Sequence, residues 1–274
     1  MAAQTPAPDS PGSSVAASDL YGTGVRVGIY LQTFGMLFSC IRLKCSGMKL
    51  AGASIILALL GSWCVVLHRQ EISPVEAWII LAMIGVLYLP AGCAISCPRA
   101  IVGEGVGTFA MLAATLWHTF AMIVFWASIY KKLPILDTPD VAFFFAKVSI
   151  RHWFRDFMLA ISIFQLVFDF IICIGGASLL IIGAQSWCEG EDEPDLERLL
   201  PNYDLEDGEA LFRSSAVFCA IPCLIGIVGI EMMIKWNGLH PVSDMAQPGQ
   251  AIPLAIGIII LVDGLMGLCQ PARD

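Results

Sequence analysis

The sequence predicts an all-α membrane protein, a polytopic bundle of about seven transmembrane helices. Hydrophobic residues make up 57% of the 274 residues and charged residues only 14%, whereas soluble domains average about 25% charged residues. The apolar residues gather in seven long runs, and a helix of about 20 apolar residues is what the hydrocarbon core of a bilayer requires. Ten of the 23 acidic residues lie in one short stretch, residues 189–209, so the net charge of −8 belongs to that stretch rather than to the bundle.

The same composition excludes several classes of protein. There are too few charged groups to cover a soluble surface of this size, and an acidic chain without a basic patch is not expected to bind nucleic acid. The sequence holds no phosphate loop, zinc-protease motif or nucleophile elbow. We therefore expect no nucleic-acid partner, no cofactor, no metal site and no assigned catalytic residue. The lipid bilayer is the partner that the composition predicts.

The apolar runs predict seven spans, at residues 24–41, 50–68, 77–97, 105–130, 157–187, 214–234 and 251–269. Each must be helical, because lipid cannot satisfy the hydrogen-bonding groups of an exposed backbone. Polar residues interrupt the first run at Arg26 and Gln32 and the last run at Asp263. The fifth run would measure about 46 Å as a helix, so it must tilt or extend beyond a hydrocarbon core of about 30 Å.

Three further segments receive assignments. Residues 1–22 are rich in Ala, Pro and Ser, which predicts a disordered tail. Residues 138–154 mix aromatic residues with Lys147 and Arg151, which predicts an amphipathic helix at the membrane interface. Residues 188–213 form a long acidic loop, which we expect to be solvated and open to cations or to a protein partner. The side of the N-terminus carries slightly more Lys and Arg, which places the N-terminus in the cytoplasm.

Two stretches at the ends of the membrane region resemble a large group of uncharacterised multi-pass membrane proteins from filamentous fungi. The first reads Tyr-Gly-x-Gly-Val-Arg-x-Gly-Ile-Tyr-x-Gln over residues 21–32. The second reads Glu-x-x-Ile-x-Trp-Asn over residues 231–237, followed by Gly-Gln-x-Ile-Pro over residues 249–253. Ala251 departs from the bulkier aliphatic residue of the group. The resemblance implies a fungal origin and a shared fold, and it assigns no activity and no role to any residue.

Three charged residues of these stretches are candidates for the mouth of a site. Arg26 begins the first span, where a long side chain can snorkel to the headgroups or face a ligand at a cavity mouth. Glu231 and Lys235 are four residues apart on one helix face, in the order that favours an ion pair. We expect this pair to lie at the membrane interface.

Polar residues inside the spans predict a buried layer. Counted from the ends of their spans at 1.5 Å per residue, four groups lie about 18 Å deep: Tyr88, His118, Asp169 and Asp263. A stripe with helical spacing holds Asp169 together with Ser162, Gln165, Cys173 and Gly176. Thr119 follows His118 on the fourth span. Nearby glycines favour a close helix contact around Asp263, so we expect its side chain to face protein.

Ionisable groups inside spans are costly and mark candidate functional sites. The interpretation that we favour is proton- or cation-linked transport, in which the His and Asp side chains relay protons through the bundle. A membrane-embedded enzyme would instead use paired carboxylates as acid and base on a lipid-like substrate. A seven-helix receptor and a purely structural role, with hydrogen bonds across helices, are further alternatives. The ligand class is accordingly a small ion or a lipid-like molecule.

Overall fold

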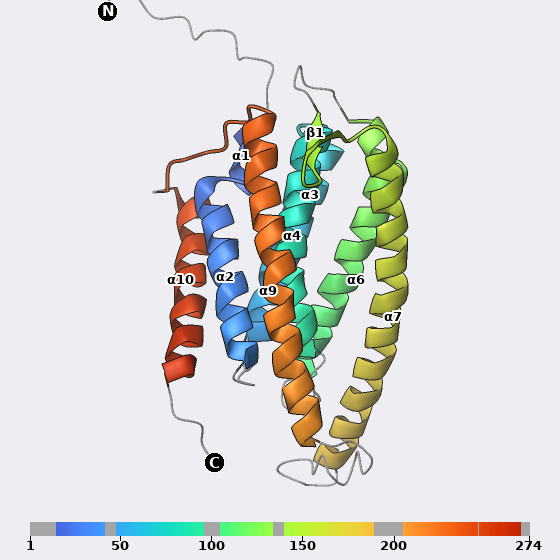
Figure 1. Ribbon diagram of the computed structural model, residues 1–274, viewed down its shortest axis with the longest axis vertical. Helices are drawn as coiled ribbons and strands as arrows, with labels where there is room; N and C mark the ends of the chain where they lie inside the picture. The colour runs from blue at the N-terminus through green and yellow to red at the C-terminus, as the bar shows by residue number, and fades with distance from the viewer. Residues whose placement is uncertain are drawn as a thin grey trace, which may run out of the picture.

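The computed structural model of the protein is a bundle of long helices that run roughly parallel to one axis (Figure 1). It describes residues 15–41, 48–95, 105–133, 140–188, 205–245 and 247–269. The helices are α1 (Val15–Leu20), α2 (Thr23–Ile41), α3 (Met48–His68), α4 (Pro74–Ile95), α6 (Gly105–Ala127), the 3-10 turn η1 (Ile129–Lys131), α7 (Trp153–Cys188), α9 (Leu205–Trp236) and α10 (Pro248–Cys269). Each of the seven apolar runs overlaps one of the long helices, so the all-α fold class is confirmed.

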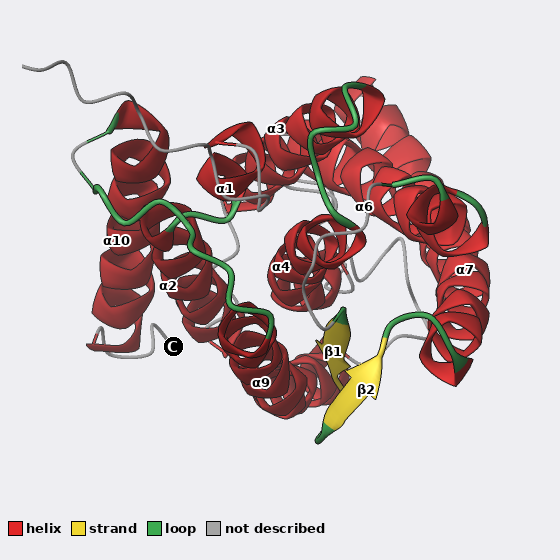
Figure 2. Cartoon of the chain, turned by 90° about the horizontal axis from the view of Figure 1, so that it is seen from above, coloured by secondary structure: helices red, strands yellow, loops and turns green. Residues whose placement is uncertain are grey.

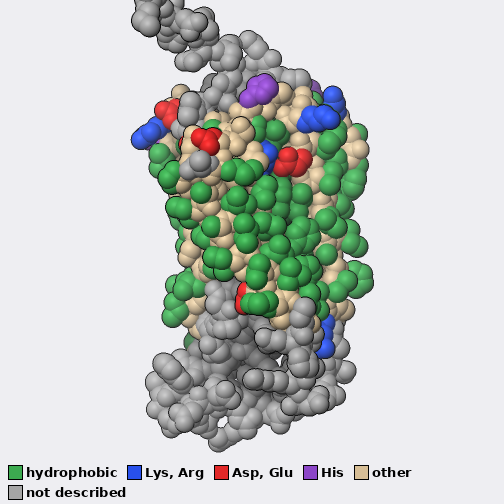
Figure 3. Space-filling view, turned by 90° about the vertical axis from the view of Figure 1, so that its left-hand side faces the viewer, with side chains coloured by type: hydrophobic (Ala, Val, Ile, Leu, Met, Phe, Trp, Pro, Cys, Tyr) green, Lys and Arg blue, Asp and Glu red, His purple; other side chains and the backbone are tan. Residues whose placement is uncertain are grey.

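The helices have the length and composition of membrane spans. In the described part of the chain, six are long and apolar enough to cross a bilayer, and α4 adds a shorter apolar stretch, Pro74–Pro90. These helices fit an integral membrane protein. Figure 3 shows a broad apolar band on the side of α10 and α2, with most of the charged side chains at its upper rim. With 36 and 32 residues, α7 and α9 extend below the other helices in Figure 1.

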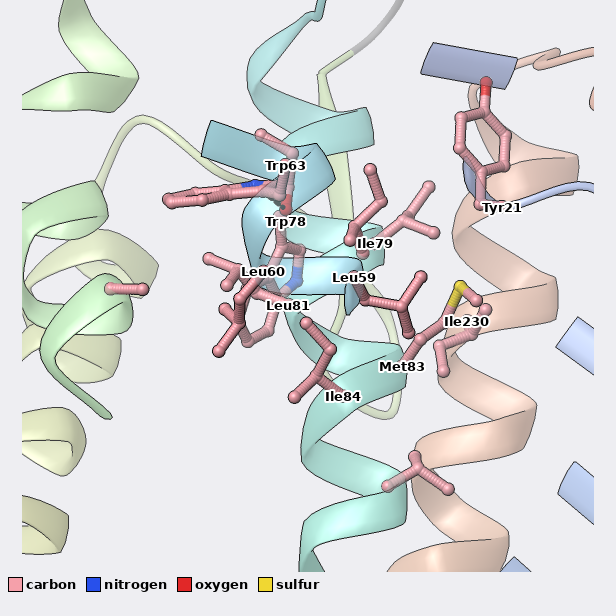
Figure 4. Packing of buried hydrophobic residues seen from close by; sticks show 14 of the residues in the cluster. Tyr21, Leu59, Leu60, Trp63, Trp78, Ile79, Leu81, Met83, Ile84 and Ile230 are labelled. Atoms are coloured by element: carbon pink, nitrogen blue, oxygen red, sulfur yellow. Dashed lines mark hydrogen bonds between the residues drawn. The ribbon is translucent and has the colours of Figure 1, made fainter. Parts of the chain in front are cut away.

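Helix α4 lies at the centre of the bundle, and Figure 2 shows the other long helices arranged around it. It packs against α2, α3, α6 and α9, and its sequence is apolar on all faces, as expected for a helix that is surrounded by protein. Figure 4 shows Ile79, Met83 and Ile84 of α4 between Leu59 and Leu60 of α3 and Ile230 of α9. The indole of Trp63 also donates a hydrogen bond of 3.1 Å to the Ala77 carbonyl.

Helix α10 lies outside this ring and packs mainly against α2. Glycines on both helices bring the two backbones together, because a Cβ atom placed on Gly28 would lie 2.3 Å from the Pro253 carbonyl oxygen, and one on Gly257 would lie 2.3 Å from the Gly28 carbonyl oxygen. The Gln250 side chain links the helix ends, accepting hydrogen bonds from the Gly24 and Val25 amides at 3.1 and 3.3 Å. The two stretches that carry the fungal resemblance therefore meet at the upper end of the bundle.

The interfacial helix predicted over 138–154 is wrong. Residues 141–149 form an antiparallel hairpin, in which β1 (Val141–Phe143) pairs with β2 (Lys147–Ser149). Two features favour the hairpin: aromatic residues favour strands, and Phe145 takes a positive φ of 56° in a three-residue turn. Asn237 anchors the hairpin on α9, since its amide accepts from the Val141 amide at 3.0 Å and donates to the Val141 carbonyl at 2.8 Å.

Two segment boundaries also differ from the prediction. Residues 15–20 of the predicted tail form α1, which packs against α3 and α4 and buries Ala17. Residues 205–213 of the predicted acidic loop belong to the first turns of α9. Residues 1–14 and 189–204 of these assignments lie outside the described residues. Of the rest, Tyr21 is fully buried and Cys188 is the last residue of α7.

Candidate functional site

Asp169 of α7 is the centre of a hydrogen-bonded network that joins three helices. Its side chain is only 2% exposed. One carboxylate oxygen, Oδ1, accepts from the Tyr88 hydroxyl of α4 and from the Gln165 amide, the latter at 2.9 Å. The other oxygen, Oδ2, accepts from the Thr119 hydroxyl of α6. Gln165 also donates to the Tyr88 hydroxyl at 2.7 Å, so the four polar groups form one closed cluster.

The spacing along α7 places the cluster. The stripe of Ser162, Gln165, Asp169, Cys173 and Gly176 turns toward the bundle, while the residues between these positions, such as Phe164 and Phe168, are exposed. Gly176 continues the same face, since a Cβ atom there would lie 3.2 Å from a methyl group of Leu112 on α6. Asp169 is therefore buried because α7 contributes only one narrow face to the bundle and that face is its polar stripe.

His118 of α6 lies beside this cluster. Its ring centroid is 6.0 Å from that of Tyr88, and its Nε2 atom is 3.1 Å from the Leu81 carbonyl oxygen of α4. A carbonyl only accepts hydrogen bonds, so Nε2 carries the hydrogen and Nδ1 carries the lone pair in the neutral ring. Tyr88, His118, Gln165 and Asp169 of the predicted layer thus lie together.

Asp263 does not join the layer, and the expectation that it faces protein is wrong. Its side chain is exposed, and α10 and α7 lie on opposite sides of α4 in Figure 2. The glycines near Asp263 do mark a close contact, because a Cβ atom on Gly264 would lie 2.6 Å from the Gly35 carbonyl oxygen of α2. Asp263 is the neighbour of Gly264, however, and successive helical residues point about 100° apart.

Of the three candidate mouth residues, Glu231 of α9 pairs with Arg26, whereas the sequence spacing predicts a pair with Lys235. The Lys235 side chain is exposed. The Oε1 atom of Glu231 lies 3.0 Å from Nε of Arg26 and accepts a hydrogen bond of 2.9 Å from the Tyr30 hydroxyl of α2. Arg26 is 7% exposed and donates to the Tyr21 carbonyl, so it links α2 to α9 and does not snorkel to the headgroups.

Sequence reasoning missed a second buried carboxylate, Glu76 at the start of α4. It is fully buried, and its Oε1 atom accepts a hydrogen bond of 2.7 Å from the Tyr21 hydroxyl. Its Oε2 atom accepts from the Ser73 amide at 2.9 Å, and the Ser73 hydroxyl accepts from the Glu76 amide at 3.3 Å. This reciprocal pair is a capping box, and the Ser-x-x-Glu spacing was the signal that could have found it.

Lys49 near the start of α3 was also missed. The sequence places it at a membrane boundary, but its side chain is fully buried, and its Nζ atom donates a hydrogen bond of 3.0 Å to the Thr108 hydroxyl of α6. No sequence signal separates a buried lysine at a span end from one that extends to the headgroups, since both follow the same apolar pattern.

The Asp169 cluster can hold its acid in two protonation states. A carboxylate at this position accepts from two hydroxyls and one amide, as described above. When the acid takes a proton, it becomes a donor as well, and either hydroxyl can turn to accept, because a hydroxyl both donates and accepts hydrogen bonds. The hydrogen of the hydroxyl that turns must then find an acceptor outside these four groups, so protonation would change the hydrogen bonds of the cluster.

Comparison with known proteins adds no assignment: no family model, no curated protein and no solved structure matches this chain.

Proposed function

We propose that the protein is a multi-pass membrane protein that moves protons, or a cation coupled to protons, across the bilayer, with Asp169 as the group that gains and loses the proton. The observation that carries this proposal is the burial of the Asp169 carboxylate among three neutral donors from α4, α6 and α7. An acidic group at the centre of a span costs about 2.5–3.5 kcal/mol even on the mildest scale. A neutral amide could hold the helices together without that cost.

The surroundings of Asp169 support a role in proton exchange. None of its described partners carries a fixed positive charge, so protonation or a bound cation is what would neutralise the carboxylate. Tyr88 and Gln165 both contact the acid and are only partly buried, so the cluster is partly accessible at these two side chains. His118 adds a second group that can take a proton, because its Nδ1 lone pair is available in the neutral ring.

The geometry argues against a membrane-embedded enzyme that uses paired carboxylates. Acid and base catalysis by paired carboxylates needs two such groups within reach of one substrate. Asp263, the expected partner, lies on the far side of α4, and no other carboxylate among the described residues joins the Asp169 cluster. The fungal resemblance stays a prediction.

A flux assay in proteoliposomes tests the proposal. The purified protein is reconstituted with a pH-sensitive dye inside the vesicles, and proton movement is followed after a pH step, with Na⁺ or K⁺ outside and with a potassium diffusion potential. We expect flux above that of protein-free vesicles and its loss in Asp169→Asn. Asp263→Asn is the matched control, because it makes the same chemical change on an exposed face and should keep the flux.

Two results would overturn the proposal. One is wild-type protein that moves no more protons than empty vesicles under every gradient. The other is Asp169→Asn protein that keeps full flux and the unfolding midpoint of the wild type, which would leave Asp169 a packing role. Thr119→Val sharpens the assay, since it removes one donor without removing the acid and should slow the flux rather than abolish it.

A further inference from the structure

A groove of about 390 Å³ lies on the outer face of the bundle between α3 and α6, which pack side by side at its edge (Figure 2). It is separate from the Asp169 cluster, because none of its lining residues belongs to that cluster. Its walls are apolar and include Trp63, Leu67, Trp117, Phe120 and Val124. Trp117 and Phe120 are 41% and 61% exposed, so these aromatic surfaces would face lipid tails in a bilayer.

The polar lining residues gather at one end of the groove. His68 is the last residue of α3, Gln70 comes two residues later, and Lys132 follows η1 after the end of α6. None of the lining residues is acidic, and two further exposed bases, Arg69 and Lys131, are their neighbours in sequence. This end of the groove therefore offers hydrogen-bond donors and positive charge.

The distance from Trp117 to the polar end of the groove fits a lipid in one leaflet of the bilayer. Trp117 lies ten residues before the last residue of α6, Ala127, and ten residues of helix rise about 15 Å, roughly half of the hydrocarbon core. A molecule in this groove would place an apolar chain along α6 and a polar group beside Lys132. Positive charge at the membrane surface attracts anionic headgroups by about 1 kcal/mol per Lys or Arg.

We propose that this groove is a binding site for one anionic phospholipid. An acyl chain lies against Trp117 and Phe120, and the phosphate accepts hydrogen bonds from Lys132 and His68. The positive end selects this lipid over two others that could fill the apolar walls equally well. Phosphatidylcholine carries the same phosphate, but its choline cation cancels the net attraction to Lys132, and a sterol offers no charged partner at all. The proposal does not depend on the transport function.

Quenching of tryptophan fluorescence tests the site. The protein is placed in micelles or nanodiscs of unlabelled phosphatidylcholine, and brominated phosphatidylglycerol or brominated phosphatidylcholine is added in steps. We expect brominated phosphatidylglycerol to quench at lower mole fraction, and unlabelled phosphatidylglycerol to reverse this quenching. Trp117→Phe should remove the preferentially quenched component. Lys132→Gln should lower the preference about fivefold, the factor that corresponds to about 1 kcal/mol.

Two matched variants control the experiment. Lys235→Gln removes an exposed lysine of α9, outside the groove, and should keep the preference. Lys132→Arg keeps the charge and should also keep it, which separates loss of charge from loss of fold. The proposal is overturned if both brominated lipids quench equally, if Lys132→Gln binds like the wild type, or if a sterol displaces brominated phosphatidylglycerol better than unlabelled phosphatidylglycerol does.

Discussion

The two helix interfaces on opposite sides of α4 are built in opposite ways. Between α2 and α10, glycines remove the side chains and the backbones themselves are in contact. Between α7 and its neighbours α4 and α6, polar side chains of three helices meet at the Asp169 carboxylate. Close backbone contact leaves no room for a polar cluster, whereas a polar cluster needs the space that longer side chains provide. A glycine stripe therefore indicates a helix partner, and a polar stripe indicates a candidate site.

The largest effect is expected at the glycine interface. Gly257→Leu would drive a side chain into the Gly28 backbone, which cannot move without displacing α2. We expect a loss of about 3 kcal/mol or more, at or above the upper end of measured overpacking costs, seen as a lower thermal unfolding midpoint in detergent. Gly267→Leu is the control on the same helix, because nothing lies within 4 Å of a Cβ atom there. Equal unfolding midpoints for the two variants would contradict the close contact.

The next largest loss of stability is expected at the polar interface around Asp169. Asp169→Ala leaves the Tyr88 and Thr119 hydroxyls and the Gln165 amide without their shared acceptor, and unsatisfied buried groups cost about 1–3 kcal/mol. Asp169→Asn keeps one acceptor oxygen and should lose less than half as much. Chemical denaturation in mixed micelles measures both. If the Asn and Ala variants are equally unstable, the negative charge itself holds the helices together.

A smaller effect is expected where the glycine interface has its own polar link. Gln250→Ala removes the acceptor of the Gly24 and Val25 amides at the start of α2, which is the role of an N-cap side chain. Removing such a cap costs about 1 kcal/mol. Gln250→Glu keeps the acceptor oxygen but replaces the Nε2 group that donates to the Asp19 carbonyl at 2.9 Å, so it should recover only part of this loss. A Gln250→Ala protein with the wild-type unfolding midpoint would show that the glycine contact alone orders this end.

The smallest effect is expected at Asp263. Its side chain is exposed in the folded bundle, so Asp263→Leu removes no contact with another helix and takes an acidic group off the lipid-facing surface. The unfolding midpoint should not fall below that of the wild type. A drop in that midpoint comparable to the drop for Asp169→Ala would mean that Asp263 contacts protein after all.

Hydropathy and helical spacing were sufficient for the fold class and for most of the polar cluster. The seven apolar runs predict the long helices because hydrocarbon forces each span to satisfy its own backbone. The stripe on α7 and the depth count brought Tyr88, His118 and Asp169 to one level, since helical rise is regular.

Choices between nearby faces and partners were not predictable in the same way. Asp263 and Gly264 are neighbours in sequence, and only the contact with α2 decides which of them faces protein. Glu231 had a lysine at the favoured spacing, but Arg26 and Tyr30 approach it from another helix, and tertiary partners of this kind leave no local signal. The hairpin at 141–149 depends on Asn237, which is nearly 100 residues further along the chain.

The pairing of α2 with α10 has a consequence for how the protein is made. Among the described residues, the first long helix finds its partner in the last one, and about 200 residues separate them, which takes about 10–40 s to synthesise. Throughout that time the glycine face of α2 is in the membrane without its cover. If synthesis stopped early, the released chain would expose the glycine face of α2 in the membrane. The membrane's quality-control machinery could recognise this exposed face and so distinguish incomplete chains from complete ones.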